Sequence, residues 1–320
     1  MRFYLWRWLG RCLRLFRGRQ LRGALFLLTS VAGVGVALAG DSVTVEAQEY
    51  SAYQDPEQPA LSLVLSDDQN LDEFQVEFGL GDGKIEEVRA AILKENEALA
   101  LAYAESEQII RANEGLPPEE IEEKINASGY HEEVRAAIAE TKSSVESLLP
   151  EERRGDLATW VDAKLAQQER KFSEASASTY QTSARKRGVS CKVFATQYRG
   201  YTRSEVALPH RILKDRGGYT VSIRRGKHTT KAKVKEVGPW NIRDDYWQSR
   251  KHRDMWDNLP RCTPEAQAAY FKNYHKGKDQ FGRKVLNPAG IDLTPRVASK
   301  LGLKRYENDW VQVHFPWVGR

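Results

Sequence analysis

Apolar residues recur at helical spacing through the middle of the chain. Across residues 83–174 they follow one another at intervals of three, four and seven, as at Ile85, Val88 and Ile92. Such a stripe is typical of amphipathic helices that bury one face against a neighbour. We therefore predict a small antiparallel helical bundle or a coiled stalk over residues 83–180.

Three breaks divide this helical pattern. Turn or helix-start signals lie at residues 115–118, 129–130 and 149–150. The segments 86–92 and 132–138 have the same sequence, Glu-Glu-Val-Arg-Ala-Ala-Ile. This identity predicts a duplicated helical unit, although two copies are too few for a solenoid.

Residues 41–82 differ in composition from the helical pattern that follows. They are polar, acidic and rich in Ser, Gln, Asp and Glu, and only short apolar fragments such as 61–65 resemble strands. Segments with few apolar residues bury too little surface to offset the entropy that ordering costs. We predict a mostly flexible acidic spacer over this range.

The C-terminal part of the chain changes to short runs of alternating apolar and polar residues. Such runs are typical of β-strands, and the Gly- and Pro-containing turns between them favour a β-barrel. A polar and aromatic insertion, 241–286, interrupts the runs and contains a helix start at 263–265. Loops of this length are commonly functional. The predicted strand segments are 191–198, 219–224, 229–237 and 310–315, with the start of a further element at 207–210 and a strand, turn and strand over 285–293, whose turn is at 287–290.

The N-terminal 40 residues have the pattern of a targeting or anchoring segment. Seven arginines and no acidic residue are found there, and an apolar run of 16 residues extends from Ala24 to Ala39. A membrane-spanning helix usually needs about 20 residues, and Ala37-Leu38-Ala39 matches a small-residue cleavage site. A cleaved signal peptide and an uncleaved membrane anchor over residues 1–40 are both open. Either one predicts export of the rest of the chain, and the Arg-rich end can contact an anionic membrane surface.

Charge is distributed unevenly along the 320 residues. Residues 1–40 carry +7, residues 41–184 hold 12 basic and 32 acidic residues for a net −20, and residues 185–320 hold 30 basic and 12 acidic residues for a net +18. Opposite charges of this size attract, but charge alone fixes no geometry, so two alternatives are open: the acidic helices dock on the basic region, or they form a stalk that holds it away from the membrane. The basic region also predicts an anionic partner. We do not expect nucleic acid, because the sequence has no known nucleic-acid-binding motif and carries an export pattern.

Two short motifs stand in order in the basic region. Gly-Pro-Trp occupies 238–240 after a predicted strand, and Gly-Ile-Asp-Leu-Thr occupies 290–294 before a short helix and a final strand. In this order and setting, residues 185–320 resemble the double-psi β-barrel of the RlpA-like and expansin-like families. The resemblance implies a six-stranded double-psi β-barrel for this region. Together with the patterns of the preceding segments, the sequence predicts an α+β multidomain protein made of a signal or anchor, an acidic helical bundle or stalk, and the barrel with its helical insertion.

The resemblance also implies glycan chemistry. RlpA-like lytic transglycosylases cleave peptidoglycan and expansins loosen wall polymers, and the Asp of the second motif, Asp292, is the implied acid. Glu236 is the second carboxylate, at a position where the family commonly has Asp. Asp292 precedes a helix N-terminus, where the backbone N–H groups favour an ionised carboxylate. The alternative is that Asp292 is a structural hydrogen-bond acceptor, as an Asp before a helix commonly is.

Aromatic side chains in the same region favour binding, because their faces stack on sugar rings and exclude water. They are also ordinary core residues. Some barrels of these families have a histidine in the site, and the resemblance implies that role for His210. A lone histidine next to a proline is otherwise commonly a packing or surface residue. The expected substrate-binding residues are Trp240, Tyr246, Trp247, His210 and Trp310.

Two cysteines, Cys191 and Cys262, follow the export pattern. In an exported chain such a pair predicts one disulfide rather than two free thiols or zinc ligands, since no Cys-x-x-Cys spacing is present. Acidic residues at 244–245 and 254–257 fit no known calcium loop. We expect no cofactor and no metal. The sequence thus predicts a cell-envelope protein that binds, and in one alternative cleaves, cell-wall glycan; the other alternative is a non-catalytic wall-polymer or protein binding module.

Overall fold

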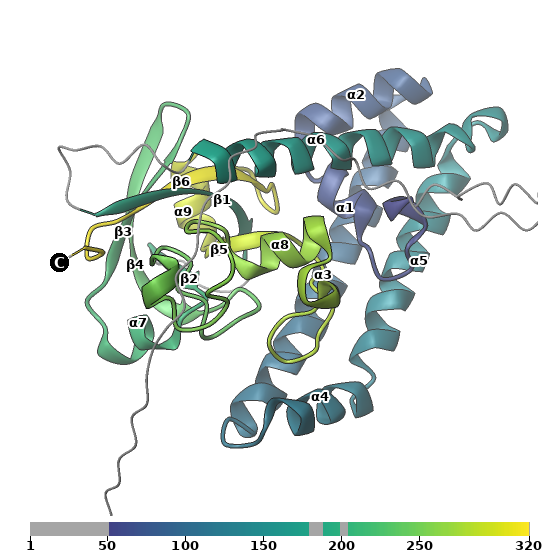
Figure 1. Ribbon diagram of the computed structural model, residues 1–320. Coiled ribbons are helices and arrows are strands. Elements are labelled where there is room, and N and C mark those ends of the chain that lie inside the picture. The colour runs from purple at the N-terminus through teal and green to yellow at the C-terminus, as the bar shows by residue number, and fades with distance from the viewer. Residues whose placement is uncertain (1–50, 179–187, 199–203, 320) are drawn as a thin grey trace, which may run out of the picture. The chain divides into compact units, whose positions relative to one another are not determined.

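Six strands close into a barrel in the computed structural model, which describes residues 51–178, 188–198 and 204–319 (Figure 1). Around the barrel the order is β1-β5-β2-β4-β3-β6, with β1 parallel to β5, β2 parallel to β4, and antiparallel pairing elsewhere. This arrangement is compatible with a double-psi barrel. The strands are β1 (Val189–Gln197), β2 (Glu205–Leu208), β3 (Thr220–Arg225), β4 (His228–Val237), β5 (Ala289–Leu293) and β6 (Asp309–Phe315).

Alternation of apolar and polar residues decides which side of each strand faces the barrel interior. In β4, Thr230, Ala232 and Val234 are buried, while the lysines between them are exposed. Because side chains of a strand alternate between its two faces, this pattern sends the lysines outward. The same alternation in β5 places Ile291 and Leu293 in the barrel core.

Nine α-helices lie within the described ranges of the chain. The predicted breaks at 115–118, 129–130 and 149–150 are confirmed as helix boundaries, and the helix predicted in the insertion is confirmed as α8. The helices are α1 (Ala60–Leu65), α2 (Asp68–Phe78), α3 (Asp82–Ala112), α4 (Pro118–Ala127), α5 (Tyr130–Leu148), α6 (Asp156–Ser178), α7 (Arg211–Arg216), α8 (Glu265–Lys272) and α9 (Pro295–Lys300).

The two copies of the repeated heptapeptide lie on paired helices. One copy is in α3 and the other is in α5, and these helices run antiparallel, because Lys84 bonds the carbonyl of Leu148 while Lys94 pairs with Glu140. Buried Val88 of the first copy and Val134 of the second each join an apolar cluster. The predicted antiparallel pairing of helices is therefore present.

The structure corrects the prediction of a flexible spacer for residues 60–78. All six residues of α1 are buried, including those expected to resemble a strand, and α2 is capped by Asp67, whose side chain accepts a hydrogen bond from the N–H of Asn70 at 2.9 Å. Phe74 and Phe78 pack against Trp160 of α6, with ring centroids 5.2 and 6.2 Å apart. The acidic composition belongs to the exposed face of α2, and its spaced aromatics supply the buried surface that orders it.

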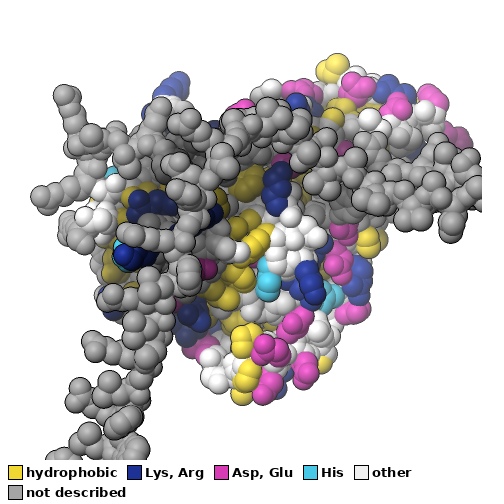
Figure 2. All heavy atoms as spheres, viewed as in Figure 1, with side chains coloured by type: hydrophobic (Ala, Val, Ile, Leu, Met, Phe, Trp, Pro, Cys, Tyr) yellow, Lys and Arg dark blue, Asp and Glu magenta, His cyan; other side chains and the backbone are white. Residues whose placement is uncertain are grey.

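Helices and barrel share an apolar core. Phe194 of β1 and Trp310 of β6 belong to the same buried cluster as residues of α1, α2, α3 and α6, and α6 lies along β1 (Figure 1). Ion pairs add to this contact: Arg211–Glu114 at 2.9 Å, Lys278–Glu122 at 2.7 Å and Arg305–Glu97 at 3.3 Å. Acidic side chains are visible over α2 and α4 in Figure 2. Residues 49–320 form one unit by their internal contacts.

A disulfide joins Cys191 of β1 to Cys262 in the insertion, as the sequence analysis pairs them. Both cysteines are buried in the barrel core. The bridge therefore fixes the middle of the insertion to the barrel. The predicted signal or anchor over residues 1–40 lies outside the described residues, and within those residues no helix is long and apolar enough to cross a membrane.

Candidate functional site

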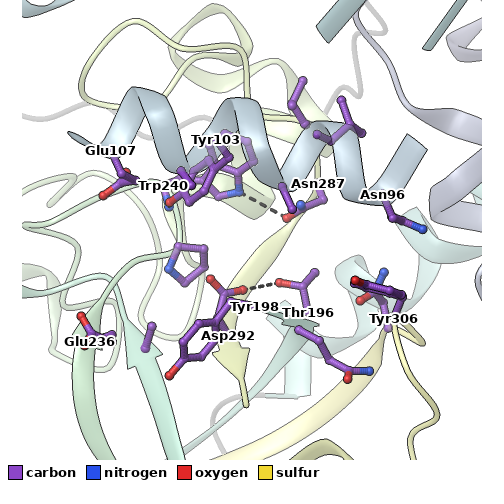
Figure 3. Close-up of a pocket in the computed structure, with 18 of the residues that line it drawn as sticks. Asn96, Tyr103, Glu107, Thr196, Tyr198, Glu236, Trp240, Asn287, Asp292 and Tyr306 are labelled. Atoms are coloured by element: carbon purple, nitrogen blue, oxygen red, sulfur yellow. Dashed lines mark hydrogen bonds between the residues drawn. The ribbon is translucent and has the colours of Figure 1, made fainter. Parts of the chain in front are cut away.

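A cavity of about 620 Å³ lies between helix α3 and the barrel (Figure 3). Its volume is in the range of pockets that hold small ligands, roughly 300–1,000 Å³. One face of α3 forms a wall along four turns, from Asn96 to Arg111, and the strand ends of the barrel form the opposite wall. The spacing along α3 follows from the helix, in which residues three and four apart share a face. The wall residues of α3 are Asn96, Leu99, Ala100, Tyr103, Ala104, Glu107, Gln108 and Arg111.

Asp292 lies on the barrel wall of this cavity. Its neighbours in β5, Ile291 and Leu293, point into the barrel core, so Asp292 points outward, toward α3 (Figure 3). β5 pairs with both β1 and β2 at this residue, where Asp292 is opposite Thr196 and Ala207. The fold thus holds the carboxyl group in the middle of three strands.

The surroundings of Asp292 favour its protonated form. Burial, opposed by a hydrogen bond from Thr196 and assisted by the charge of Glu107, raises the pKa of Asp292 to about 6. Desolvation thus acts against the ionised form that the helix N-terminus is expected to favour. The hydroxyl of Thr196 donates to Oδ1 of Asp292, and the part of the chain that the structure describes offers no hydrogen bond to Oδ2.

Trp240 follows the Gly-Pro motif and is held from two directions. Its backbone N–H donates to the hydroxyl of Tyr103 at 3.0 Å, and its carbonyl accepts from Arg283 at 2.7 Å. Its φ of +62° is unusual for a residue other than glycine and costs on the order of 1–3 kcal/mol. The indole N–H donates to Asn287 at 3.3 Å. These contacts place Trp240 at the cavity, against the ring of Tyr103 at a centroid distance of 5.1 Å.

Arg283 connects the insertion, α3 and the Gly-Pro motif. This side chain is fully buried, and it bonds Asp279 at 2.7 Å, Ser106 at 2.9 Å and Glu107 at 2.7 Å. Together with its bond to the carbonyl of Trp240, these contacts fix one end of the cavity. A buried ion pair costs desolvation energy, so such a network is poor evidence of stability alone.

Glu236 also lines the cavity, at the end of β4. Its carboxylate pairs with Lys214 of α7 at 3.0 Å. The ion pair engages one oxygen of this carboxylate, as the Thr196 hydroxyl does for Asp292.

The other expected site residues lie away from the cavity. Tyr246 and Trp247 are buried in the barrel core against Phe315, with centroid distances of 5.7 and 4.8 Å. Trp310 is buried between barrel and helices and donates to Gln168 at 3.0 Å. His210 is buried, with Nε2 3.6 Å from a carboxylate oxygen of Asp254. Of the aromatic and histidine residues expected to bind substrate, the structure brings only Trp240 to Asp292.

The acidic residues of the insertion are held by basic side chains. Asp244 pairs with buried Arg253 at 2.5 Å and accepts the N–H of Glu265 at 2.7 Å, while Asp254 pairs with Arg243 at 3.0 Å. Burial raises the pKa of Asp244. Among the residues that the structure describes, no group of three or more His, Cys, Asp or Glu side chains could hold a metal ion.

Several cavity residues were not expected from the sequence. Tyr103, Thr196, Asn287 and Tyr306 line the cavity but belong to none of the sequence motifs. One signal was present: after Leu99 the helical stripe changes from aliphatic residues to Ala, Tyr and Glu, which is unusual for a face that only packs.

Residues 178–314 match a family model described as a domain of unknown function, DUF8814. The match includes the barrel motifs and the insertion, and it covers less than half of the chain, so the α3 wall lies outside it. No curated protein matches the chain. No solved structure matches it either.

Proposed function

We propose that this protein binds cell-wall glycan in the cavity between α3 and the barrel and cleaves it with Asp292 as the acid. The observation that carries the proposal is the position of Asp292, a carboxyl group with a pKa of about 6 on the wall of a cavity of about 620 Å³. A group that protonates a glycosidic oxygen near neutral pH needs such a raised pKa. The open Oδ2 is the atom that would carry the proton.

The cavity walls suit a sugar. Tyr103, Tyr198, Tyr306 and Trp240 line it together with the amides of Asn96 and Asn287. Aromatic rings provide apolar surface for sugar faces, and amide groups accept and donate hydrogen bonds to hydroxyls. The closed barrel is compatible with the RlpA-like and expansin-like resemblance of its motifs, and that resemblance supports peptidoglycan as the polymer.

In the reaction, Asp292 donates its proton to the glycosidic oxygen while the bond from that oxygen to the anomeric carbon breaks. If a hydroxyl of the same sugar then attacks the anomeric carbon, its proton goes to the Asp292 carboxylate, and the acid is restored. One carboxyl group is sufficient for both steps. The N-terminal segment fits this role, since its Arg-rich and apolar pattern would export the chain or anchor it outside the cytoplasm, where wall polymers lie.

A non-catalytic wall-binding module is the second candidate. The observation that favours it is that both barrel carboxylates already have partners, Thr196 for Asp292 and Lys214 for Glu236. Such a module would keep the cavity and its aromatic residues and would release no fragments.

The test is incubation of the full chain, and of its Asp292→Asn variant, with peptidoglycan sacculi. Soluble fragments and pelleted protein are measured together. We expect fragments from the parent alone and pelleting of both proteins. Pelleting without fragments would establish the binding module. The absence of both pelleting and fragments would overturn the glycan function.

A further inference from the structure

We infer that Glu107 of α3 is a second catalytic carboxylate of this site, which accepts a proton from the water that attacks the anomeric carbon. The inference rests on the proposed function and changes its reaction class from intramolecular transfer to hydrolysis. Glu107 lies outside the barrel and outside the region that carries the resemblance. Nothing in the barrel sequence predicts it.

The first observation is that Glu107 and Asp292 line one cavity from opposite walls. Glu107 belongs to α3 and Asp292 to β5, and Figure 3 shows them on either side of the space. They are close enough for the charge of Glu107 to contribute to the raised pKa of Asp292. Two carboxyl groups on opposite sides of a scissile bond are the usual equipment of a glycoside hydrolase.

The second observation is that each carboxyl group has one oxygen engaged and one oxygen open. Arg283 donates to Oε1 of Glu107 at 2.7 Å, and Thr196 donates to Oδ1 of Asp292. Among the described residues no hydrogen bond reaches Oε2 or Oδ2. The partners also differ: Glu107 pairs with a cationic guanidinium, whereas Asp292 has a neutral hydroxyl as its partner and burial favours its protonated form. This difference assigns Glu107 as the base and Asp292 as the acid.

The third observation is how firmly Glu107 is held. Its partner Arg283 is fully buried and is fixed by Asp279 and by the carbonyl of Trp240. One helical turn before Glu107, Tyr103 accepts the N–H of Trp240. Contacts on both sides of the turn thus fix this carboxylate relative to the barrel, as expected of a preorganised catalytic group.

The step balances as a hydrolysis. Asp292 gives its proton to the leaving glycosidic oxygen, and the bond from that oxygen to the anomeric carbon breaks. Water forms the new bond to the anomeric carbon, and Glu107 takes the proton that the water loses. The product is a reducing end, whereas intramolecular transfer leaves an anhydro end.

The test measures reducing ends and anhydro ends released from sacculi by the full chain and by Glu107→Gln. Glu105→Gln is the matched control, because Glu105 lies on the same helix, is exposed and does not line this cavity. We expect reducing ends from the parent, a loss in kcat of about 10²–10⁴-fold in Glu107→Gln with little change in KM, and no effect in the control. A merely structural role would lower the melting temperature and would not respond to added nucleophile. Sodium azide should therefore restore bond cleavage to Glu107→Ala.

Three outcomes would overturn the inference. Anhydro ends from the parent, or an unchanged rate in Glu107→Gln, would remove Glu107 from the chemistry while the proposed glycan function of Asp292 stands. Absence of any cleavage by the parent would reject both catalytic roles, and pelleting with sacculi would then leave only wall binding.

Discussion

The hydroxyl of Tyr103 in α3 accepts the backbone N–H of Trp240, the residue after the Gly-Pro motif, at 3.0 Å. A residue of the helical part thus holds the backbone of a barrel motif 137 positions later in the chain. The same tyrosine lines the cavity with Asp292. The proposed site is therefore built from two regions that the sequence keeps apart.

Tyr103→Phe tests this contact. The ring contact with Trp240 would remain, but a largely buried N–H would lose its acceptor, which costs about 1–3 kcal/mol. We expect a lower free energy of unfolding by that amount in urea titration. Tyr306→Phe is the control, because its hydroxyl accepts from the exposed side chain of Arg305. Equal effects of the two substitutions would contradict the role of Tyr103.

Asp292→Asn should remove a pH-dependent contribution to the stability of the folded chain. The pKa of Asp292 is raised from its ordinary value of 3.8 to about 6. The native state therefore holds the proton more tightly than the unfolded chain does, and stability falls as pH rises from about 4 to about 6. Above pH 6 the loss is about 3 kcal/mol, so Asp292→Asn should be more stable than the parent at pH 8 and equal to it near pH 4. Urea unfolding at the two pH values measures this.

The same titration sets the pH dependence of cleavage. Only protonated Asp292 can donate to the glycosidic oxygen, so the parent rate should fall tenfold per pH unit above about pH 6. A rate–pH profile on sacculi measures the decline. A rate that stays level between pH 6 and pH 8 would show that another group is the acid.

Glu95 gives a second pH-dependent contribution to stability, in the helical part. It is 2% exposed, Ser62 donates to it at 2.5 Å, and burial raises the pKa of Glu95 to about 7 from 4.5. The native state again binds the proton more tightly, so stability falls between pH 4.5 and pH 7, by about 3 kcal/mol. Glu95→Gln keeps an acceptor for Ser62 and removes the charge. Its melting temperature should exceed that of the parent at pH 8 and match it at pH 4.5, while a higher value at both would point to a cause other than ionisation.

Filling the cavity should block ligand binding without unfolding the chain. Ala104 of α3 lines the cavity, whereas Leu101 on the same helix is 57% exposed and does not. We expect Ala104→Trp to weaken co-pelleting with sacculi at least tenfold and Leu101→Trp to leave it unchanged. Circular dichroism checks that both variants fold. Equal pelleting of the two would place the glycan elsewhere on the surface.

Local pattern was sufficient for most elements of the fold. Helical spacing predicted the α3 and α5 pair, and alternation with turns predicted the strands of the barrel, because these periodicities follow from backbone geometry alone. The error at residues 60–78 has a physical reason. Composition describes the exposed acidic face of α2, and the burial of Phe74 and Phe78 depends on Trp160, some eighty residues away.

The sequence by itself determined that Asp292 and Trp240 belong to short motifs of a barrel, and that Cys191 and Cys262 form its natural disulfide pair. Tertiary structure decided which residues surround them. The packing of α3 against the barrel brings Tyr103 and Glu107 to the cavity, and packing inside the barrel removes Tyr246 and Trp247 from it. A side chain's partners depend on contacts between distant segments, and one-dimensional spacing carries no information about them.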